Sequence, residues 1–495
     1  MSLFSFEKPG YAETHYKFKL PWSLLYRPFP EIIIDAPFQV IPGRKLTLLI
    51  AVRDADKFPA EILSLTAEIK DEHGTVRHFE QKLSIHVNRL LDFFPVELPA
   101  LPAGKYRIDP KLSIRAGKKE KTITRWNLPG LKPAPLLVQI LAENPPLAPG
   151  FIAGEMHCHT HYSSDPVEFG APPKVLQQAA ADVGLDFVLT TDHAYDFAFE
   201  AVDYMKPAAP EKRFRELQKE IEKLPAHPRL IAGLEVSAGN AKKENIHLLA
   251  FNPPHYLPGL GDSGRFWFHN QPAFSVPEIL AQSGAVCFAA HPKVPIGKLE
   301  RLIFRRGEWN PEDLSLKSPN PVRGLQFWNG SLDRGFERGK AWWIEELEKG
   351  NRLLPIGGND AHGDFNDTTG ISLPLFSLKY SRNHVFGRVR TVVRNFGFNK
   401  TDCLYLTNGP ALWWEHSKTG LTFFARSTAD YGKIKSIHLF AQTEPGAKEK
   451  TVHTVSPENT FESEIEFPLR EFMYARAECL TEQGLLALTS AAFPD

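Results

Sequence analysis

Short apolar segments alternate with amphipathic ones between residues 151 and 365, and most of the apolar segments end on His, Asp or Glu. Segments 186–191, 229–234 and 285–290 have the length and composition of buried strands, whereas 172–183 and 335–349 repeat apolar residues at helical spacing. This alternation predicts a parallel β/α architecture. Because no Gly-x-Gly-x-x-Gly motif opens a helix, we expect a β/α barrel and not a dinucleotide-binding sheet.

The chain on either side of this middle part reads as one strand after another. Apolar runs such as 45–52 are separated by Pro, Gly and Asp, which is typical of a β-sandwich. The proline-rich stretch 144–150 reads as a linker. We therefore predict a β-sandwich-like domain at 1–147, a barrel at 151–399 and a small β domain at 400–495.

Composition narrows the possible partners. The 58 Lys and Arg residues cancel the 58 Asp and Glu residues, which argues against a nucleic-acid-binding protein but permits a small anionic substrate. The four cysteines lie far apart without a Cys-x-x-Cys pair, so we expect neither a disulfide framework nor a thiolate zinc site. We see no signal peptide and no apolar stretch that spans a bilayer, so the expected location is the cytoplasm, with no membrane contact. The oligomeric state stays open.

His157 and His159 lie two residues apart after the apolar approach Phe151-Ile152-Ala153. If this stretch is a strand, the two imidazoles project from one face and can bind one metal ion. Cys158 then points to the other face, where it packs against the wall. Three histidines within five residues also fit a polar loop, so the pair alone decides nothing.

Further ligand-type residues follow the predicted strands, at the carboxyl ends where a parallel barrel builds its active site. The full candidate set is His157, His159, Asp165, His193, Glu235, His247, His291, Asp360 and His362. Such a mixture of imidazoles and carboxylates suits Zn, Mn or Fe. Nine ligands exceed what one tetrahedral ion needs, so we expect two or three divalent ions that share bridging groups.

The motifs His-x-His, Thr-Asp-His, Gly-Leu-Glu, a strand His, Ala-His-Pro and Asn-Asp-Ala-His occur in this order over residues 152–365. In this order they resemble the PHP (polymerase and histidinol phosphatase) superfamily. The flanking β segments and the run 475–490 resemble its CehA/McbA-type subgroup. The resemblance implies a distorted (β/α)7 barrel with a trinuclear metal site.

The resemblance also implies how the ligands are shared. One metal takes His157, His159, Glu235 and Asp360; a second takes Glu235 as a bridge with His247 and His291; a third takes Asp165, His193 and His362. The family usually places its Asp five residues after the second His, whereas Asp165 lies six after His159 and precedes Pro166. His161 is therefore a rival of Asp165 at the third metal.

These ligands predict a metal-dependent hydrolase, in which a metal-bridging hydroxide attacks phosphorus or a carbonyl carbon. The residues expected to act in catalysis are His157, His159, Glu235, Asp360 and His362. The first hypothesis is a phosphoesterase that acts on a small phosphate ester, with Arg305, Arg306 or Lys293 as candidate phosphate contacts. The alternative is a carbamate, ester or amide hydrolase, which the aromatic run Phe266-Trp267-Phe268 would suit. A third hypothesis is a metal-binding scaffold without catalysis.

Overall fold

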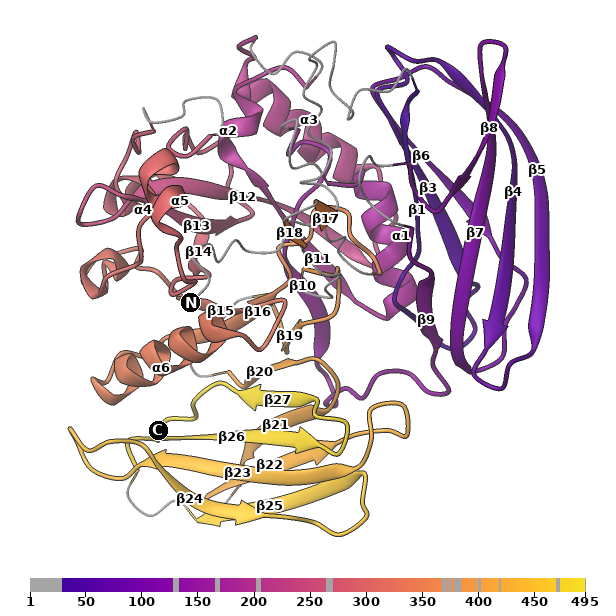
Figure 1. Ribbon diagram of the computed structural model, residues 1–495. Helices are drawn as coiled ribbons and strands as arrows, with labels where there is room; N and C mark the ends of the chain where they lie inside the picture. Colours follow the sequence, from indigo (N-terminus) through magenta and orange to yellow (C-terminus); the bar gives the residue numbers. More distant parts are fainter. Residues whose placement is uncertain are drawn as a thin grey trace.

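The protein is described from a computed structural model, in which the chain forms several β-sheets and a small number of helices (Figure 1). The structure describes residues 29–127, 133–164, 170–201, 206–263, 270–366, 372–373, 376–377, 384–396, 398, 402–417, 420–468 and 472–494.

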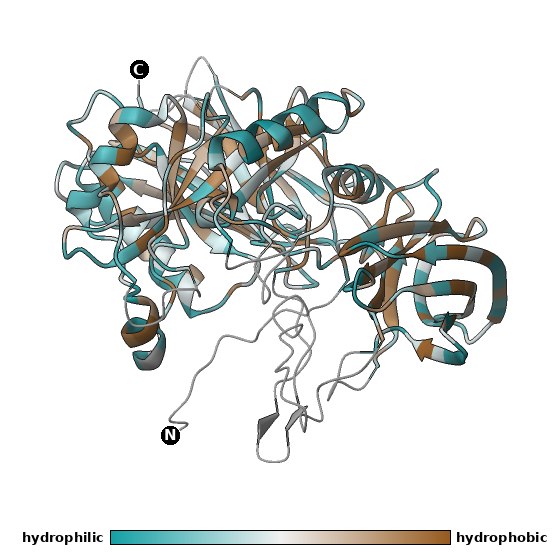
Figure 2. Ribbon diagram, turned by 90° about the horizontal axis from the view of Figure 1, so that it is seen from above, coloured by the Kyte–Doolittle hydropathy of each residue, from teal (hydrophilic) through white to brown (hydrophobic). Residues whose placement is uncertain are grey.

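Two sheets make up the N-terminal part. One has the order β1 (Glu31–Asp35), β3 (Thr47–Arg53), β6 (Leu91–Glu97). The other has the order β2 (Gln39–Val40), β9 (Leu136–Ile140), β7 (Gly104–Ala116), β4 (Ala60–Asp71), β5 (Val76–Val87), with β8 (Lys119–Thr124) paired to β7. Buried and exposed residues alternate along β7, as expected for a strand with one face on a core. Figure 2 shows this alternation as hydrophobic and hydrophilic bands along the strands of this region.

The middle of the chain contributes the first strands of one large mixed sheet. This sheet has the order β16 (Leu354–Gly358), β15 (Gly324–Asn329), β14 (Val286–Ala290), β13 (Asn245–Phe251), β12 (Arg229–Gly239), β11 (Phe187–His193), β10 (Ile152–Cys158), β19 (Arg390–Val393), β20 (Leu404–Thr407), β27 (Leu486–Thr489), β26 (Tyr474–Thr481), β23 (Ile434–Gln442), β24 (Lys450–Val455). The last five strands of this order come from the C-terminal part of the chain. Beside them, β21 (Ala411–His416), β22 (Gly420–Arg426) and β25 (Glu462–Pro468) form a separate sheet, and β17 (Ser372–Leu373) pairs with β18 (Phe376–Ser377).

The prediction of a distorted (β/α)7 barrel is wrong, because strands hold far more of the chain than helices do and the central strands belong to this mixed sheet. β13 pairs antiparallel with both β12 and β14, so the alternating parallel pattern is broken in the middle. The cause is the short connection 240–244, since two parallel strands need a crossover of roughly a dozen residues or more. With so few residues, β12 and β13 form a hairpin, and no helix covers that step.

The helices are α1 (Pro173–Val183), α2 (Ala194–Phe197), α3 (Pro210–Glu222), α4 (Val276–Ser283), α5 (Lys298–Phe304) and α6 (Arg334–Glu348), with a short 3-10 turn at Pro311–Leu314. The predicted segment 172–183 matches α1, because proline begins this helix and the left-handed Gly184 ends it. Helix α4 has similar signals, with proline as its second residue and the left-handed Gly284 at its end. Within the described ranges, no helix combines the length and the apolar character that a membrane span requires.

Candidate metal centre

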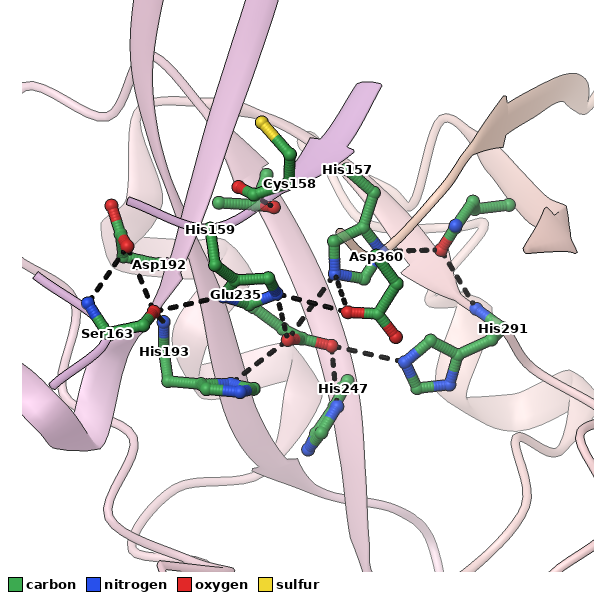
Figure 3. A network of polar contacts seen from close by, with 12 residues as sticks. His157, Cys158, His159, Ser163, Asp192, His193, Glu235, His247, His291 and Asp360 are labelled. Atoms are coloured by element: carbon green, nitrogen blue, oxygen red, sulfur yellow. Dashed lines mark hydrogen bonds and ion pairs between the residues drawn. The ribbon is translucent and has the colours of Figure 1, made fainter. Parts of the chain in front are cut away.

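Eight of the nine candidate ligands come together at one end of the mixed sheet. The eight are His157 in β10, His159 just after it, His193 at the end of β11, Glu235 in β12, His247 in β13, His291 after β14, and Asp360 and His362 after β16. Figure 3 labels seven of them, all but His362. Asp165 lies outside the described residues.

Backbone hydrogen bonds join the two chain segments that carry half of these ligands. The amide of Asp360 donates to the carbonyl of His157 at 2.7 Å, and the amide of His159 donates to the carbonyl of Ala361 at 2.9 Å. Asp360 has φ 53°, a left-handed backbone conformation that costs a non-glycine residue roughly 1–2 kcal/mol. The pairing with β10 therefore holds Asp360 in a conformation that aims its carboxylate at the two histidines.

Glu235 is the centre of the cluster and is 1% exposed (Figure 3). Its Oε1 lies 2.5 Å from Nδ1 of His247 and 3.1 Å from Nε2 of His291. Its Oε2 lies 3.0 Å from Nδ1 of His193 and 3.4 Å from Nε2 of His157. Burial alone would raise the pKa of this carboxyl, but the surrounding imidazoles outweigh burial and hold its pKa well below the usual range. Glu235 is therefore an anion with ligand atoms on both of its oxygens.

The first ligand group consists of His157, His159, Glu235 and Asp360, and it has the dimensions of a metal site. Oε2 of Glu235 lies 3.4 Å from Nε2 of His157 and 3.5 Å from Nε2 of His159. Oδ1 of Asp360 lies 3.3 Å and 3.1 Å from the same two nitrogens. A tetrahedral ion with bonds of 2.0–2.1 Å separates its ligands by about 3.3 Å. Four of the six edges of such a tetrahedron are therefore present among these atoms.

The hydrogen bonds at the far side of the imidazoles settle which nitrogen carries the proton. Nδ1 of His157 donates to Oε1 of Gln326 at 3.0 Å. Nδ1 of His159 lies 3.0 Å from Oγ of Ser163, which itself donates to Oδ1 of Asp192 and so accepts from the imidazole. In the neutral rings, the lone pair of each Nε2 then points into the cluster, which is the arrangement that a metal ligand needs.

Buried atoms that lack hydrogen bonds support the same conclusion. Nε2 of His157, Oε2 of Glu235 and Nδ1 of His247 have no hydrogen-bond partner among the described residues. Buried polar atoms are nearly always satisfied. One ion beside His157 and Glu235 and a second beside Glu235 and His247 would satisfy all three atoms. The residues present therefore fit divalent cations.

Two further ligand groups adjoin the first. Glu235, His247 and His291 form one group, and His159, His193 and His362 form the other. Glu235 and His159 each belong to two groups, so neighbouring ions would share ligands. The rings of His159 and His362 stack with centroids 3.9 Å apart, which places His362 against the first group.

In the absence of cations, protons on some of the imidazoles offset the negative charges of the carboxylates. Burial lowers the pKa of His157, but the carboxylates of Asp360 and Glu235 outweigh burial and raise this pKa to about 9. Burial and the neighbouring His362 and His193 instead hold the pKa of His159 well below its usual value. The imidazoles thus divide into proton carriers and neutral rings, as expected where like charges crowd one site.

Asp262 is a functional residue that the sequence analysis missed. Its Oδ2 accepts a hydrogen bond from Nε2 of His247 at 2.8 Å and another from Nε of Arg306 at 2.9 Å. Its other oxygen accepts from the hydroxyl of Ser237. The loop after β13 carries Asp262, and no strand-end pattern in the sequence marks it. Its carboxylate orients His247 so that Nδ1 faces Glu235.

The other residues that the sequence analysis discussed lie outside the three ligand groups or outside the described residues. Nε2 of His161 is 3.7 Å from Oε2 of Glu220, and His161 belongs to none of the three ligand groups. Nζ of Lys293 donates to the carbonyl of Trp309 at 2.6 Å, so this lysine supports a loop. Cys158 is buried, and its Sγ faces the carbonyl of Leu189. The aromatic run 266–268 lies outside the described residues.

Comparisons with known proteins add little. No family model matches the chain, and neither does any curated protein. Solved structures with some similarity include a β-glucuronidase of Parabacteroides merdae, at 10% identity and a TM-score of 0.23, over 94% of this chain and 64% of that chain. A β-D-mannosidase of Dictyoglomus thermophilum shows 11% identity and a TM-score of 0.21, over 93% of this chain and 66% of that chain. The chain spans under two thirds of the length of either structure, and such low TM-scores carry no argument about fold or activity.

Proposed function

We propose that this protein is a metal-dependent hydrolase, and that its substrate is a small phosphate ester. The observation that carries the proposal is the set of four ligand separations between 3.1 and 3.5 Å around Glu235 and Asp360. Two or three divalent ions, of Zn, Mn or Fe, would occupy the three ligand groups. Bound there, such ions supply Lewis acidity and lower the pKa of coordinated water.

The residues of the chain would perform distinct tasks in this reaction. Glu235 and His159 connect neighbouring groups and so fix the spacing of the ions. Gln326 and Asp262 hold the rings of His157 and His247 in the ligating tautomer. Because all of these side chains are buried, the site needs little reorganisation before reaction.

Several adjoining ligand groups, each able to hold a cation, suit a phosphate ester in particular. A phosphoryl transition state carries charge on its equatorial oxygens as well as on the attacking and leaving oxygens. Two or three ions that share ligands can contact several of these oxygens together. We therefore assign the binding of the anionic substrate to the cations and not to arginine or lysine side chains.

A second candidate, a carbamate, ester or amide hydrolase at the same site, has one observation in its favour. Two of the three basic residues that were candidates for phosphate binding have other partners: Arg306 pairs with Asp262 at 2.9 Å and with Glu300 at 3.5 Å, and Lys293 donates to the carbonyl of Trp309. A neutral ester would not need them. The substrate test must therefore include both chemistries.

The test is turnover of an aryl phosphate and of a matching aryl carbamate by protein loaded with Mn or Zn. We expect release of the phenol from the phosphate, loss of turnover in His157→Gln, and unchanged turnover in His438→Gln. His438 lies on β23 and bonds to Ser436 and Thr454, so it controls for the loss of an imidazole outside the site.

Three outcomes would contradict the proposal in different ways. Turnover of the carbamate alone would replace the first candidate by the second. Bound metal without turnover of either compound would favour a scaffold. Elemental analysis that finds no metal, even after metal is added, would reject the metal centre itself.

A further inference from the structure

A β-bulge in β15 brings two amide side chains to the face of the sheet that carries the metal ligands. The register of β15 against β16 shifts between Gln326 and Trp328, so Phe327 is an extra residue. Residues three apart in a regular strand point to opposite faces, and one extra residue between them brings them to the same face. Gln326 and Asn329 are therefore neighbours, and Nε2 of Gln326 donates to Oδ1 of Asn329 at 2.9 Å.

The opposite face of the bulge packs on helix α6. The consecutive residues Phe327 and Trp328 both lie against Phe336 of α6, with ring centroids 5.9 Å and 5.3 Å from the ring of Phe336. Both side chains are buried. In a regular strand only one of two consecutive side chains would face the helix. These apolar contacts therefore stabilise the bulge and set the direction in which Gln326 and Asn329 point.

One backbone donor determines the orientation of both amides. The amide N–H of His291 can only donate, and it lies 3.2 Å from Oε1 of Gln326, so this atom is the oxygen of the side chain. Nδ1 of His157 donates to the same oxygen at 3.0 Å. Nε2 of Gln326 is then the donor to Asn329, and Nδ2 of Asn329 donates in turn to Oδ2 of Asp360 at 3.2 Å.

We propose that Asn329 is a positioning residue of the metal centre, which occupies Oδ2 of Asp360 so that only Oδ1 of this carboxylate binds an ion. Oδ1 is the oxygen that lies 3.3 Å from Nε2 of His157 and 3.1 Å from Nε2 of His159. Through Gln326 and Asn329, hydrogen bonds also join two ligands of the first group, His157 and Asp360. The proposal rests on the metal centre of the proposed function, but not on the reaction proposed there.

A single oxygen from Asp360 is important for any reaction at this centre. The first ligand group offers four ligand atoms when each of its residues gives one. A catalytic ion needs a position for water or substrate in addition to its protein ligands. A second oxygen from Asp360 would take this position, so the hydrogen bond from Asn329 keeps it available.

The test is the visible absorption of the full chain loaded with cobalt(II), whose absorbance per ion is strong with four ligands and weaker with five or six. We expect a loss of absorbance per bound ion in Asn329→Ala and in the isosteric Asn329→Asp. In either variant Oδ2 of Asp360 has lost its donor, so one more carboxylate oxygen can bind the ion. Asn351→Ala is the matched control, because Nδ2 of Asn351 also donates to a carboxylate, Oε2 of Glu346 at 2.7 Å, outside the three ligand groups. Its spectrum should equal that of the wild type.

The two variants of Asn329 separate the donor from the shape of the side chain. Asn329→Asp keeps the shape, so it remains informative if Asn329→Ala does not fold. A wild-type spectrum in Asn329→Asp would overturn the proposal, because the shape without the donor would then be sufficient. An equal loss of absorbance in Asn351→Ala would also overturn it. A wild type that binds cobalt while every variant has the same spectrum rejects the role of Asn329 alone, whereas a wild type that binds no cobalt rejects the metal centre and this proposal together.

Discussion

Nε2 of His247 lies 2.8 Å from Oδ2 of Asp262, on the side of the imidazole that faces away from Glu235. The ring is thus held between two carboxylates. Burial lowers the pKa of His247, but these carboxylates outweigh burial and raise its pKa to about 9. Burial would raise the pKa of Asp262, yet His247 and Arg306 hold that pKa far below its ordinary value. The pair orients one ligand of the second group, Glu235, His247 and His291.

Asp262→Asn is expected to weaken metal binding at this second group. An amide can still accept a hydrogen bond but does not stabilise the imidazole as an anion does, and the loss of such a partner typically costs 10- to 100-fold in metal affinity, about 1.4–2.7 kcal/mol. A competition titration against a chromophoric chelator measures the change. Asp109→Asn removes a carboxylate from the half-exposed strand β7 and should leave the affinity unchanged. Equal affinity in Asp262→Asn and the wild type would show that Asp262 does not orient His247.

Glu235→Gln is expected to destabilise the protein and to remove most of its metal. The glutamate lies within 3.5 Å of five histidines, and the removal of one partner from a buried charged cluster typically costs about 3–5 kcal/mol. Urea unfolding in the presence of a chelator measures the stability, and elemental analysis measures the metal. Glu466→Gln, on the exposed side of β25, is the control. A free energy of unfolding equal to that of the wild type would show that the carboxylate is not the anchor of the cluster.

The metal-free protein is expected to lose stability as the pH rises from 6.5 to 8.5. His157 and His247 both have a pKa of about 9 in the folded chain, against 6.5 when unfolded. A pKa raised by folding contributes stability that is complete below pH 6.5 and disappears as the pH passes through 9. Over this range each of the two histidines contributes a loss on the order of 2 kcal/mol.

Urea unfolding at several pH values, with and without metal, checks this expectation. The buried thiols, whose pKa burial raises, affect stability only above their ordinary value of 9.0 and so stay outside the range. Bound ions replace the protons, so the metal-loaded protein should not lose stability in this window. If the protein from which metal has been removed by a chelator gains stability between pH 6.5 and 8.5, the assigned protonation states are contradicted.

His193→Gln and His161→Gln separate a ligand from its sequence neighbour. His193 belongs to the third ligand group with His159 and His362, whereas His161 belongs to none. We expect His193→Gln to lower the number of ions bound per chain and His161→Gln to leave it unchanged, as measured by elemental analysis after dialysis. The opposite result would restore His161 as the ligand of the third metal.

Residue order alone indicates a good part of the candidate site. The pair His157 and His159 follows an apolar strand, and His193 and Asp360 follow other strands, so their convergence could be expected from strand-end placement. The same reasoning could not find Asp262 or Gln326, because Asp262 lies in a loop and Gln326 lies within strand β15, neither of them at the end of a strand. Their role depends on which loop or strand lies beside a given imidazole.

Many strands and helices can be predicted from the local sequence. The spacing of apolar residues, a proline in the first turn of a helix and a glycine after its last turn are all signals that extend over only a few residues. Helix α1 (Pro173–Val183), for example, lies within one residue of the predicted segment 172–183. How the strands pair depends instead on contacts across the whole fold. The short connection 240–244 turns β13 back against β12 and places β13 in a mixed sheet, where a barrel of parallel units was expected. Pairing direction and the neighbours of buried charges depend on contacts between residues far apart in the chain, and these set both the fold and the shared ligands of the metal centre.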